Sequence, residues 1–158
     1  MDGPVRKPNR LTDYDYSQPG GYFVTICTKD RGDCLGAVVG ADVLIGPKME
    51  LSEIGQVVQD ILLEMPTVEK FIVMPNHVHL LVQLEGNGAM GTSPPTSLPM
   101  VVRYFKRETM KRCGVRLWQR SYHDHVVRDE ADRLRIWQYI DTNPAKWRED
   151  RYYTEVET

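Results

Sequence analysis

The sequence has few cysteines and no long apolar segment. Its 158 residues include only Cys27, Cys34 and Cys113, and no two of these form a CxxC pair. An odd and widely spaced set argues against a disulfide framework and against a structural zinc ribbon, so a reducing cytoplasm is the expected compartment. No stretch approaches the roughly 18 apolar residues that a membrane span needs. Residues 1–9 contain no apolar stretch of the kind found in a signal peptide. We therefore expect a cytoplasmic protein that does not enter a membrane.

The chain also lacks a large excess of charge of either sign. The formal net charge is -2, with 41% hydrophobic and 27% charged residues, which is the composition of a soluble globular protein. The basic residues are nevertheless concentrated in the segment 101–128. They are Arg103, Lys106, Arg107, Lys111, Arg112, Arg116, Arg120 and Arg128, against the acidic Glu108 and Asp124. Such a segment is typical of a polyanion-binding site, although a solvated helix face would have the same composition.

The residue pattern predicts a single α+β domain over residues 1–158. Strands are expected over 21–28, 34–39, 43–51, 68–74 and 77–84, and the segment 115–127 should be partly extended. Helices are expected to begin after the N-caps Ser52, Ser97 and Asp129 and to end near Met65, Cys113 and Thr142. This order predicts an antiparallel sheet with helices mainly on one face. The stretch at about 85–96, rich in Gly, Ser and Pro, is expected to be a flexible loop inside the domain.

Two histidines stand where a strand would hold them side by side. His77 and His79 are two residues apart in the expected strand 77–84, so both imidazoles should point to the same face. The row that faces the core would then be Val78, Leu80, Val82 and Leu84. Two neutral imidazole nitrogens in fixed geometry make half of a divalent-metal site. Two ordinary surface histidines would give the same sequence pattern.

A tyrosine and an asparagine occupy the third expected helix. Tyr139 and Asn143 are four residues apart, so they should lie on one face of that helix, about one turn from each other. A tyrosine hydroxyl has an ordinary pKa of about 10 and needs a cation or a base nearby to react with phosphate. The amide oxygen of Asn143 would complete a metal shell and place the hydroxyl beside the ion. The alternative is a tyrosine packed in the core and an Asn-Pro sequence that ends the helix.

Four collinear segments resemble one family of DNA-cleaving enzymes. Residues 74–81 (MPNHVHLL) look like the HUH motif of the IS200-like single-tyrosine (Y1) transposases. Residues 10–28, 118–128 and 136–144 are similar to blocks of the subgroup associated with repetitive extragenic palindromes (REP). The likeness covers nearly the whole chain and is weakest in the loop at about 85–96. It implies a ferredoxin-like α+β sandwich with the histidines on a central strand.

The resemblance also implies a role for each candidate residue. His77 and His79 match the histidines that bind the catalytic metal ion, Mg²⁺ or Mn²⁺, and Asn143 stands where the family has a third ligand of the amide type. Tyr139 matches the nucleophile that is joined covalently to the 5′ phosphate of cut single-stranded DNA. The implied function is a metal-dependent transposase and endonuclease that cleaves and rejoins single-stranded or hairpin DNA, as a monomer or as a homodimer.

The third metal ligand and the DNA contacts leave alternatives open. His125, which should share a strand face with His123, competes with Asn143 for the metal or serves only in structural hydrogen bonds. The expected DNA contacts are Arg103, Lys106, Arg107, Trp118 and Arg120, where Trp118 would stack on an unpaired base. A buried tryptophan beside a surface arginine would suit the sequence equally well.

Two other functions also suit the residues. A non-catalytic nucleic-acid-binding domain would use the basic helix for phosphate contacts and would need neither the histidine pair nor Tyr139. A metal-dependent hydrolase of small substrates would need further His or Asp ligands, and the only other histidines are His123 and His125.

Overall fold

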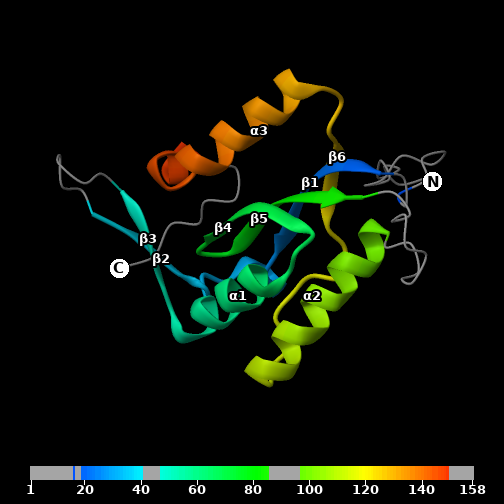
Figure 1. Ribbon diagram of the computed structural model, residues 1–158. Coiled ribbons are helices and arrows are strands. Elements are labelled where there is room, and N and C mark those ends of the chain that lie inside the picture. Colours follow the sequence, from blue (N-terminus) through cyan, green and yellow to red (C-terminus); the bar gives the residue numbers. More distant parts are fainter. Residues whose placement is uncertain (1–15, 17–18, 41–46, 86–96, 150–158) are drawn as a thin grey trace, which may run out of the picture.

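A computed structural model describes residues 16, 19–40, 47–85 and 97–149 of the chain (Figure 1). The loop expected at about 85–96 lies outside the described residues except for Glu85. Residues 10–15, which begin the segment 10–28 that resembles the family, lie outside them as well. Within the described part, no helix has both the length and the apolar character to cross a membrane.

A four-stranded antiparallel sheet forms the centre of the fold. Its strands, in spatial order, are β4 (Val68–Met74), β5 (His77–Leu84), β1 (Gly20–Cys27) and β6 (His123–Val126). The central strands β5 and β1 pair along their whole lengths, from Gly20 opposite Leu84 to Cys27 opposite His77. A separate two-stranded sheet contains β2 (Gly36–Val39) and β3 (Lys48–Leu51).

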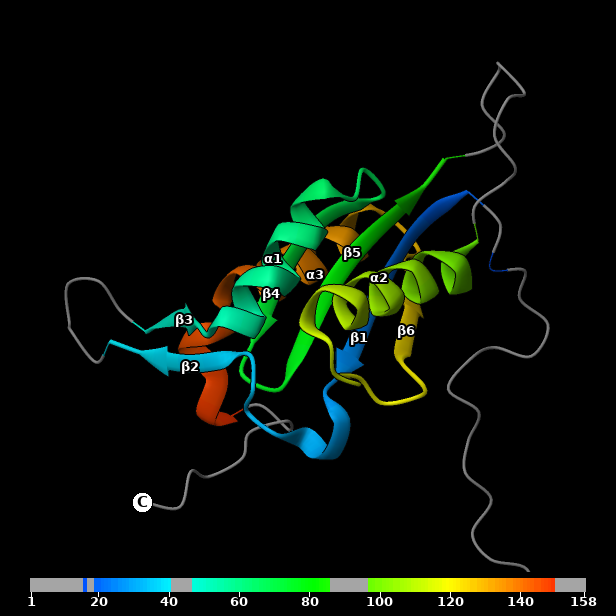
Figure 2. The ribbon, with the colours of Figure 1, turned by 90° about the horizontal axis from the view of Figure 1, so that it is seen from below.

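The helices lie on both faces of the sheet. α1 (Glu53–Glu64) and α2 (Leu98–Cys113) cover one face, and α3 (Glu130–Thr142) lies against the other, followed by the 3₁₀ segment η2 (Pro144–Glu149) (Figures 1 and 2). A short 3₁₀ turn, η1 (Lys29–Arg31), follows β1.

This connectivity is that of a ferredoxin-like domain. The order β1-α1-β4-β5-α2-β6, with the sheet order β4-β5-β1-β6, is the βαββαβ arrangement. The β2–β3 pair is inserted before α1, and α3 is added after β6 on the opposite face. The predicted α+β class with helices mainly on one face is confirmed.

Local sequence explains where the helices begin and end. Each N-cap side chain accepts a hydrogen bond from the backbone N–H three residues on: Ser52 from Gly55, Ser97 from Met100 and Asp129 from Asp132. α2 ends at Gly114, whose φ of 73° is the left-handed conformation that glycine adopts without strain. The three predicted caps are confirmed.

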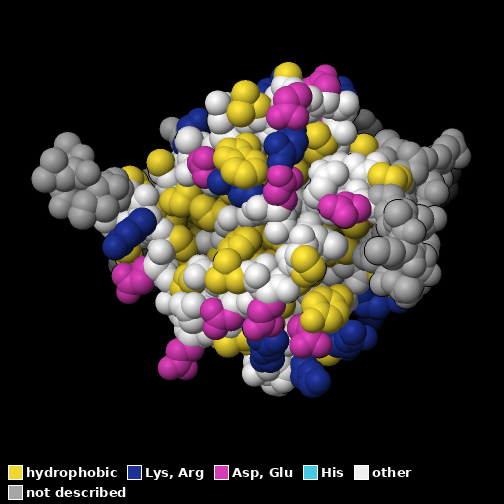
Figure 3. Space-filling view, viewed as in Figure 1, with side chains coloured by type: hydrophobic (Ala, Val, Ile, Leu, Met, Phe, Trp, Pro, Cys, Tyr) yellow, Lys and Arg dark blue, Asp and Glu magenta, His cyan; other side chains and the backbone are white. Residues whose placement is uncertain are grey.

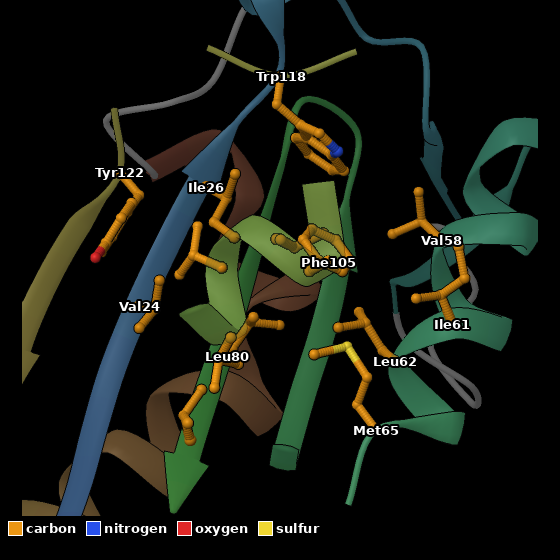
Figure 4. Close-up of a cluster of buried hydrophobic side chains, with 14 of the residues drawn as sticks. Val24, Ile26, Val58, Ile61, Leu62, Met65, Leu80, Phe105, Trp118 and Tyr122 are labelled. Atoms are coloured by element: carbon orange, nitrogen blue, oxygen red, sulfur yellow. The ribbon is translucent and has the colours of Figure 1, made fainter. Parts of the chain in front are cut away.

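The main apolar core lies between the sheet and the helix pair α1 and α2. Val78, Leu80, Val82 and Leu84 of β5 are at most 2% exposed and face this core, as their alternation predicts. Trp118 points into the same cluster, with its ring 5.1 Å from that of Phe105 (Figure 4). The indole N–H of Trp118 donates to Thr109 Oγ1 at 2.6 Å, so the ring is buried among apolar side chains and its N–H has a hydrogen-bond partner.

Packing under α3 is smaller in scale. Ile136 and Ile140 of the helix meet Leu81 of β5 in one buried cluster, with partly buried neighbours around it. A second small cluster joins Trp147 of η2 to Cys27 and Met74. Ion pairs add contacts between α3 and β4.

Candidate active site

His77 and His79 lie on β5 with both imidazoles on the face of the sheet that α3 covers. Both residues are buried, with 0% and 1% exposed, and the face of the molecule that Figure 3 shows has no histidine at its surface. The two Nε2 atoms are 3.0 Å apart and the ring centroids 4.5 Å apart. The common face predicted from strand alternation is confirmed. Because both residues are buried, the alternative of two surface histidines does not apply.

The outer nitrogen of His77 is held by the residue that precedes it. His77 Nδ1 lies 2.8 Å from Asn76 Oδ1, while Asn76 Nδ2 donates to the carbonyl oxygen of Arg31 at 3.5 Å. With its NH₂ group directed to Arg31, the amide presents an oxygen to His77, and that oxygen can only accept a hydrogen bond. The proton of neutral His77 is therefore on Nδ1, and its Nε2 carries the lone pair.

The outer nitrogen of His79 has a partner that can both donate and accept. His79 Nδ1 lies 2.8 Å from the hydroxyl oxygen of Thr25, which is directly opposite on β1. When this hydroxyl donates, His79 carries its proton on Nε2 and donates it to His77. When the hydroxyl accepts, His79 carries its proton on Nδ1 and a lone pair on Nε2, as His77 does. The second state has the outer hydrogen bonds usual for metal-binding histidines.

Two aromatic residues from the α3 segment contact the histidine rings. Tyr139 packs edge-on against His79 with ring centroids 5.2 Å apart, and Trp147 lies 5.9 Å from His77. Phe23 of β1 stacks on His79 at 5.3 Å and also contacts the edge of Tyr139 at 5.9 Å. The Tyr139 side chain is nevertheless 41% exposed. It is therefore open to a substrate while its ring contacts His79, and it is not the core tyrosine of the alternative interpretation.

Asn143 lies between these two contacts along the chain. It is four residues after Tyr139, which contacts His79, and four before Trp147, which contacts His77. Its side chain is 2% exposed, and among the described residues Oδ1 has no hydrogen-bond partner. A buried acceptor in this state is unfavourable by about 1–3 kcal/mol. The amide oxygen is therefore suited to a cation on the α3 face of the sheet.

His125 is engaged elsewhere on the same face. It lies opposite Phe23 in the register of β6 with β1, and its Nε2 is 2.8 Å from Asp132 Oδ2 in the first turn of α3. The backbone N–H of Arg128, and then the side chain of His125, hold the pKa of the Asp132 carboxyl below its ordinary value of 3.8. This geometry agrees with the structural alternative for His125, whose Nε2 is paired with Asp132.

The predicted DNA contacts line one groove. It has a volume of about 500 Å³ and lies between α2 and the segment 116–122. The five predicted contacts Arg103, Lys106, Arg107, Trp118 and Arg120 all line it, and Arg116 is a further basic residue. Apolar side chains that include Val102 and Leu117 also line it, which gives a groove with both basic and apolar walls.

The five groove residues differ in how far their side chains are exposed and available for hydrogen bonds to a ligand. Arg103, Arg107 and Arg120 are exposed. Lys106 Nζ donates to the carbonyl oxygens of Gln119 and Arg120, at 2.8 and 3.0 Å, and so ties the segment to α2. Trp118 is 6% exposed, and its ring packs in the core (Figure 4). The structure therefore favours the alternative of a buried tryptophan, because this indole is not free to stack on a base.

Comparisons with known proteins find relatives in Haemophilus influenzae. No family model matches the chain. An uncharacterized protein of Haemophilus influenzae is 30% identical over 177 residues, which cover 95% of this chain and 94% of that protein. A second protein of the same organism, provisionally named a REP-associated tyrosine transposase, is 32% identical over 82 residues, which cover 47% of each chain.

A solved structure has the same fold. It is that of a REP-associated tyrosine transposase bound to a REP hairpin, and it matches with a TM-score of 0.56 over 86% of this chain and 74% of that chain, at 19% identity. The chain thus shares the fold of one REP-associated tyrosine transposase and about half of its length with a relative given that name. The resemblance seen in the sequence is thereby confirmed, and with it an enzyme of the transposase kind.

Sequence reasoning missed four residues that surround the histidine pair of this chain. Asn76 precedes His77 directly and is an amide in a turn between two strands, which is a signal that could have been used. Trp147 follows Asn143 at helical spacing, but a tryptophan at that spacing is usually a core residue. Thr25 and Phe23 reach the site only through the pairing of β1 with β5, and no local pattern in the sequence specifies that register.

Proposed function

We propose that this protein is a metal-dependent transposase and endonuclease that cleaves and rejoins single-stranded or hairpin DNA through Tyr139. The observation that carries the proposal is an exposed tyrosine whose ring contacts His79, one of two buried histidines that lie side by side. A domain that only binds nucleic acid has no need for two buried imidazoles with their outer nitrogens held by hydrogen bonds. The alternative of a non-catalytic module therefore leaves this arrangement unexplained.

The residues present fit a divalent ion with three protein ligands. His77 and His79 would offer their Nε2 atoms and Asn143 its unpartnered Oδ1. Two ligands at right angles and about 2.1 Å from one ion lie about 3.0 Å apart, which matches the 3.0 Å between the two Nε2 atoms. A bound Mg²⁺ or Mn²⁺ would draw charge from a non-bridging phosphate oxygen and orient the scissile bond.

The ligand set also bears on the hydrolase alternative. In the described part of the chain, no group of three or more His, Cys, Asp and Glu side chains could hold a metal ion. A zinc hydrolase normally has three such ligands. The set proposed here has two imidazoles and one amide oxygen, so it lacks the third His, Cys, Asp or Glu ligand of such a hydrolase.

The proposed reaction is a transesterification at phosphorus. Tyr139 Oη attacks the scissile phosphate and loses its proton to solvent, which reaches the side chain because 41% of it is exposed. The P–O3′ bond breaks, and the leaving 3′ oxygen takes up a proton. The 5′ phosphate stays joined to the tyrosine, so the bond energy is kept for a rejoining step in which a 3′ hydroxyl attacks the phosphotyrosine.

The groove next to α2 is the proposed contact for the DNA backbone. Residues 117–119 lie alongside the end of β1, where Gln119 N donates to Cys27 O at 2.9 Å and Cys27 is opposite His77. The groove therefore begins at the end of the sheet where the histidines are. The histidines lie on the face of the sheet that α3 covers, whereas the groove lies beside α2. DNA that reaches both has to bend around this end, and a hairpin with a single-stranded flank can do so. The related transposase of known structure is bound to a REP hairpin.

Formation of a covalent adduct tests the proposal. The protein is incubated with 5′- and 3′-labelled DNA hairpins that carry single-stranded flanks, with Mn²⁺ or Mg²⁺, and the products are separated on a denaturing gel. We expect an adduct that retains the 5′ phosphate of the cut, that needs the metal and that is absent from Tyr139→Phe. Tyr104→Phe is the matched control, because Tyr104 is on α2 and is 43% exposed, close to the 41% of Tyr139.

Each other outcome has a definite meaning. An adduct that persists in Tyr139→Phe overturns the assignment of the nucleophile. DNA binding without any adduct in the wild type supports the binding module instead. His77→Ala should bind DNA with unchanged affinity in the absence of metal and form no adduct. Full cleavage by His77→Ala would overturn the proposed metal site.

A further inference from the structure

The start of α3 is attached to β6 by one buried carboxylate. Asp132 Oδ2 accepts hydrogen bonds from His125 Nε2 at 2.8 Å and from the backbone N–H of Arg128 at 3.0 Å. Its backbone N–H donates to the cap residue Asp129 at 2.8 Å, and Arg135 approaches Oδ1 at 3.4 Å. The residue is only 7% exposed. A buried and bonded carboxylate holds its surroundings in one geometry, because breaking any of these bonds leaves a buried charge without compensation.

α3 has other attachments, among them the ion pair of Arg133 with Glu69 of β4, whose side chains are 29% and 31% exposed; the His125 side chain that reaches Asp132 is itself 40% exposed. The buried apolar contact of α3 with the sheet is a cluster of three buried residues, Leu81, Ile136 and Ile140, with partly buried neighbours. The ion pair of Lys70 with Asp141 lies at the surface, where Asp141 is 56% exposed. Basic and acidic side chains stand next to one another over α3 in Figure 3. Exposed pairs of this kind contribute little, typically about 0–1 kcal/mol.

Asp132 lies on the same stripe of α3 as the candidate active-site residues. At about 100° per residue, Asp132, Tyr139 and Asn143 fall within an arc of about 40°. Tyr139 is about 10 Å further along the helix axis than Asp132. Rotation of α3 about its axis would therefore move the carboxylate and the tyrosine together, so that a bond which fixes one fixes the other.

The sheet provides a short physical connection between the two places. His125 is directly opposite Phe23 in the pairing of β6 with β1. The ring of Phe23 in turn contacts both His79, at 5.3 Å, and Tyr139, at 5.9 Å. The bond of His125 to Asp132 thus holds α3 beside the strand position from which Phe23 supports the tyrosine.

We propose that His125 and Asp132 are positioning residues that fix the rotation and height of α3 and so hold Tyr139 against His79. The consequence for catalysis rests on the proposed function of Tyr139, whereas the consequence for its position does not. Displacement of a reacting group by about 1 Å is sufficient to lower a rate about 100-fold. Loss of the bond should therefore slow the chemical step and leave DNA affinity nearly unchanged, since neither residue lines the groove.

The test compares three variants of the full chain. His125→Ala removes the donor, and His125→Gln restores an N–H at the place of Nε2. Leu134→Ala is the control on α3, because Leu134 is 55% exposed and lies on the opposite side of the helix. For each variant we would measure the single-turnover rate of adduct formation at saturating DNA, the Kd for DNA, and the nuclear Overhauser effects between the rings of Tyr139 and His79.

We expect His125→Ala to weaken these ring contacts and to slow the adduct about 10- to 100-fold, with a Kd within about twofold of wild type. His125→Gln should recover most of both losses, and Leu134→Ala should change neither. Intact ring contacts and an unchanged rate in folded His125→Ala would overturn the proposal. If His125→Ala does not fold, the test relies on His125→Gln. Because the glutamine restores the hydrogen bond, a folded His125→Gln without the ring contacts would also overturn the proposal.

Failure of the proposed function would be recognised separately. If the wild type forms no adduct but the ring contacts disappear in His125→Ala and return in His125→Gln, the positioning role stands and the role of Tyr139 as a nucleophile does not. If the wild type forms an adduct and the ring contacts and rate are the same in all three variants, Tyr139 remains the proposed nucleophile and the positioning role of His125 and Asp132 is rejected.

Discussion

The two faces of the central sheet differ in almost every property. The face under α1 and α2 is closed and apolar, with Leu80 and Phe105 at 0% exposure in one continuous cluster. The face under α3 holds two buried imidazoles, a buried amide and a buried carboxylate, with small apolar clusters around them. Both faces are built on the same strands, because alternate residues of β5 and β1 point in opposite directions.

On each shared strand, the side chains that stabilise the fold and those that form the candidate site occupy alternate positions, and they therefore point to opposite faces of the sheet. Removing a side chain from the α1 and α2 face opens a cavity in a dense core and should lower the free energy of unfolding strongly. Removing one from the α3 face deletes a polar contact and should change metal binding, acid stability or catalysis more than it changes the packing. The predictions below test this separation in order of decreasing effect.

Truncation in the apolar core should have the largest effect on stability. Phe105 is fully buried and packs against Trp118, so Phe105→Ala should lower the free energy of unfolding by about 3–5 kcal/mol. Urea denaturation followed by tryptophan fluorescence would measure it. Met110→Ala is the comparison on the same helix, since Met110 is 44% exposed, and it should change little. A loss below about 1 kcal/mol in Phe105→Ala would contradict the description of this face as the stabilising one.

The second-largest effect is expected from removal of the Asn76 amide that holds His77, and it should be a loss of metal affinity. Asn76→Ala leaves His77 Nδ1 without its 2.8 Å partner, so the tautomer with a free Nε2 is no longer selected. Loss of such a supporting contact typically lowers metal affinity about 10- to 100-fold. Isothermal titration with Mn²⁺ in the absence of DNA would measure this directly. Gln56→Ala, on the exposed side of α1, is the control, and equal affinities in the two variants would reject the role of Asn76.

The carboxylate of Asp132 should make stability depend on acidity. Because the backbone N–H of Arg128 and then His125 lower its pKa below 3.8, Asp132 stabilises the fold above that value and loses this contribution as pH falls through the lowered pKa. Asp132→Asn should cost about 1–2 kcal/mol near neutral pH, and the difference should shrink below about pH 4. Urea midpoints measured from pH 2.5 to 7 would show it. A difference that stays constant over this range would refute the linkage.

The exposed arginines of the groove should have the smallest effect, confined to DNA affinity. Each lost phosphate contact reduces the slope of log K against log salt by about 0.7 for single-stranded DNA, so Arg103→Gln with Arg107→Gln should reduce it by about 1.4. Fluorescence anisotropy between 50 and 300 mM salt would measure the slope. Arg112→Gln is the control on α2, because Arg112 pairs with Glu64 at 2.8 Å. The same slope in both proteins would exclude this groove as a phosphate contact.

Much of the fold followed from local sequence signals. The caps Ser52, Ser97 and Asp129 and the glycine at 114 stand beside the helix ends that they specify, so short-range rules located all three helices. The alternation in 77–84 gave the two faces of β5. The order of the strands did not follow from these signals, because the pairing of β1 with β5 joins residues more than 50 positions apart, such as Thr25 and His79.

The candidate site was predictable where it depends on one element and not where it depends on several. His77 with His79, and Tyr139 with Asn143, were each found from spacing on a single strand or helix. That Tyr139 contacts His79 depends on α3 packing on the opposite face from α1 and α2, which no local pattern specifies. Trp118 shows the reverse, since its place beside basic residues suggested DNA while its side chain packs in the core.

The alternation along β5 has a consequence for how this gene tolerates change. In a library of single substitutions from His77 to Leu84, the even-numbered positions should govern how much protein accumulates, because they fill the main core. The histidines among the odd-numbered positions should govern what the accumulated protein can do. Deletion of one codon is different, because it shifts every later residue to the other face. Substitutions can therefore alter abundance and activity independently in this strand, whereas a shortened strand would lose both at once.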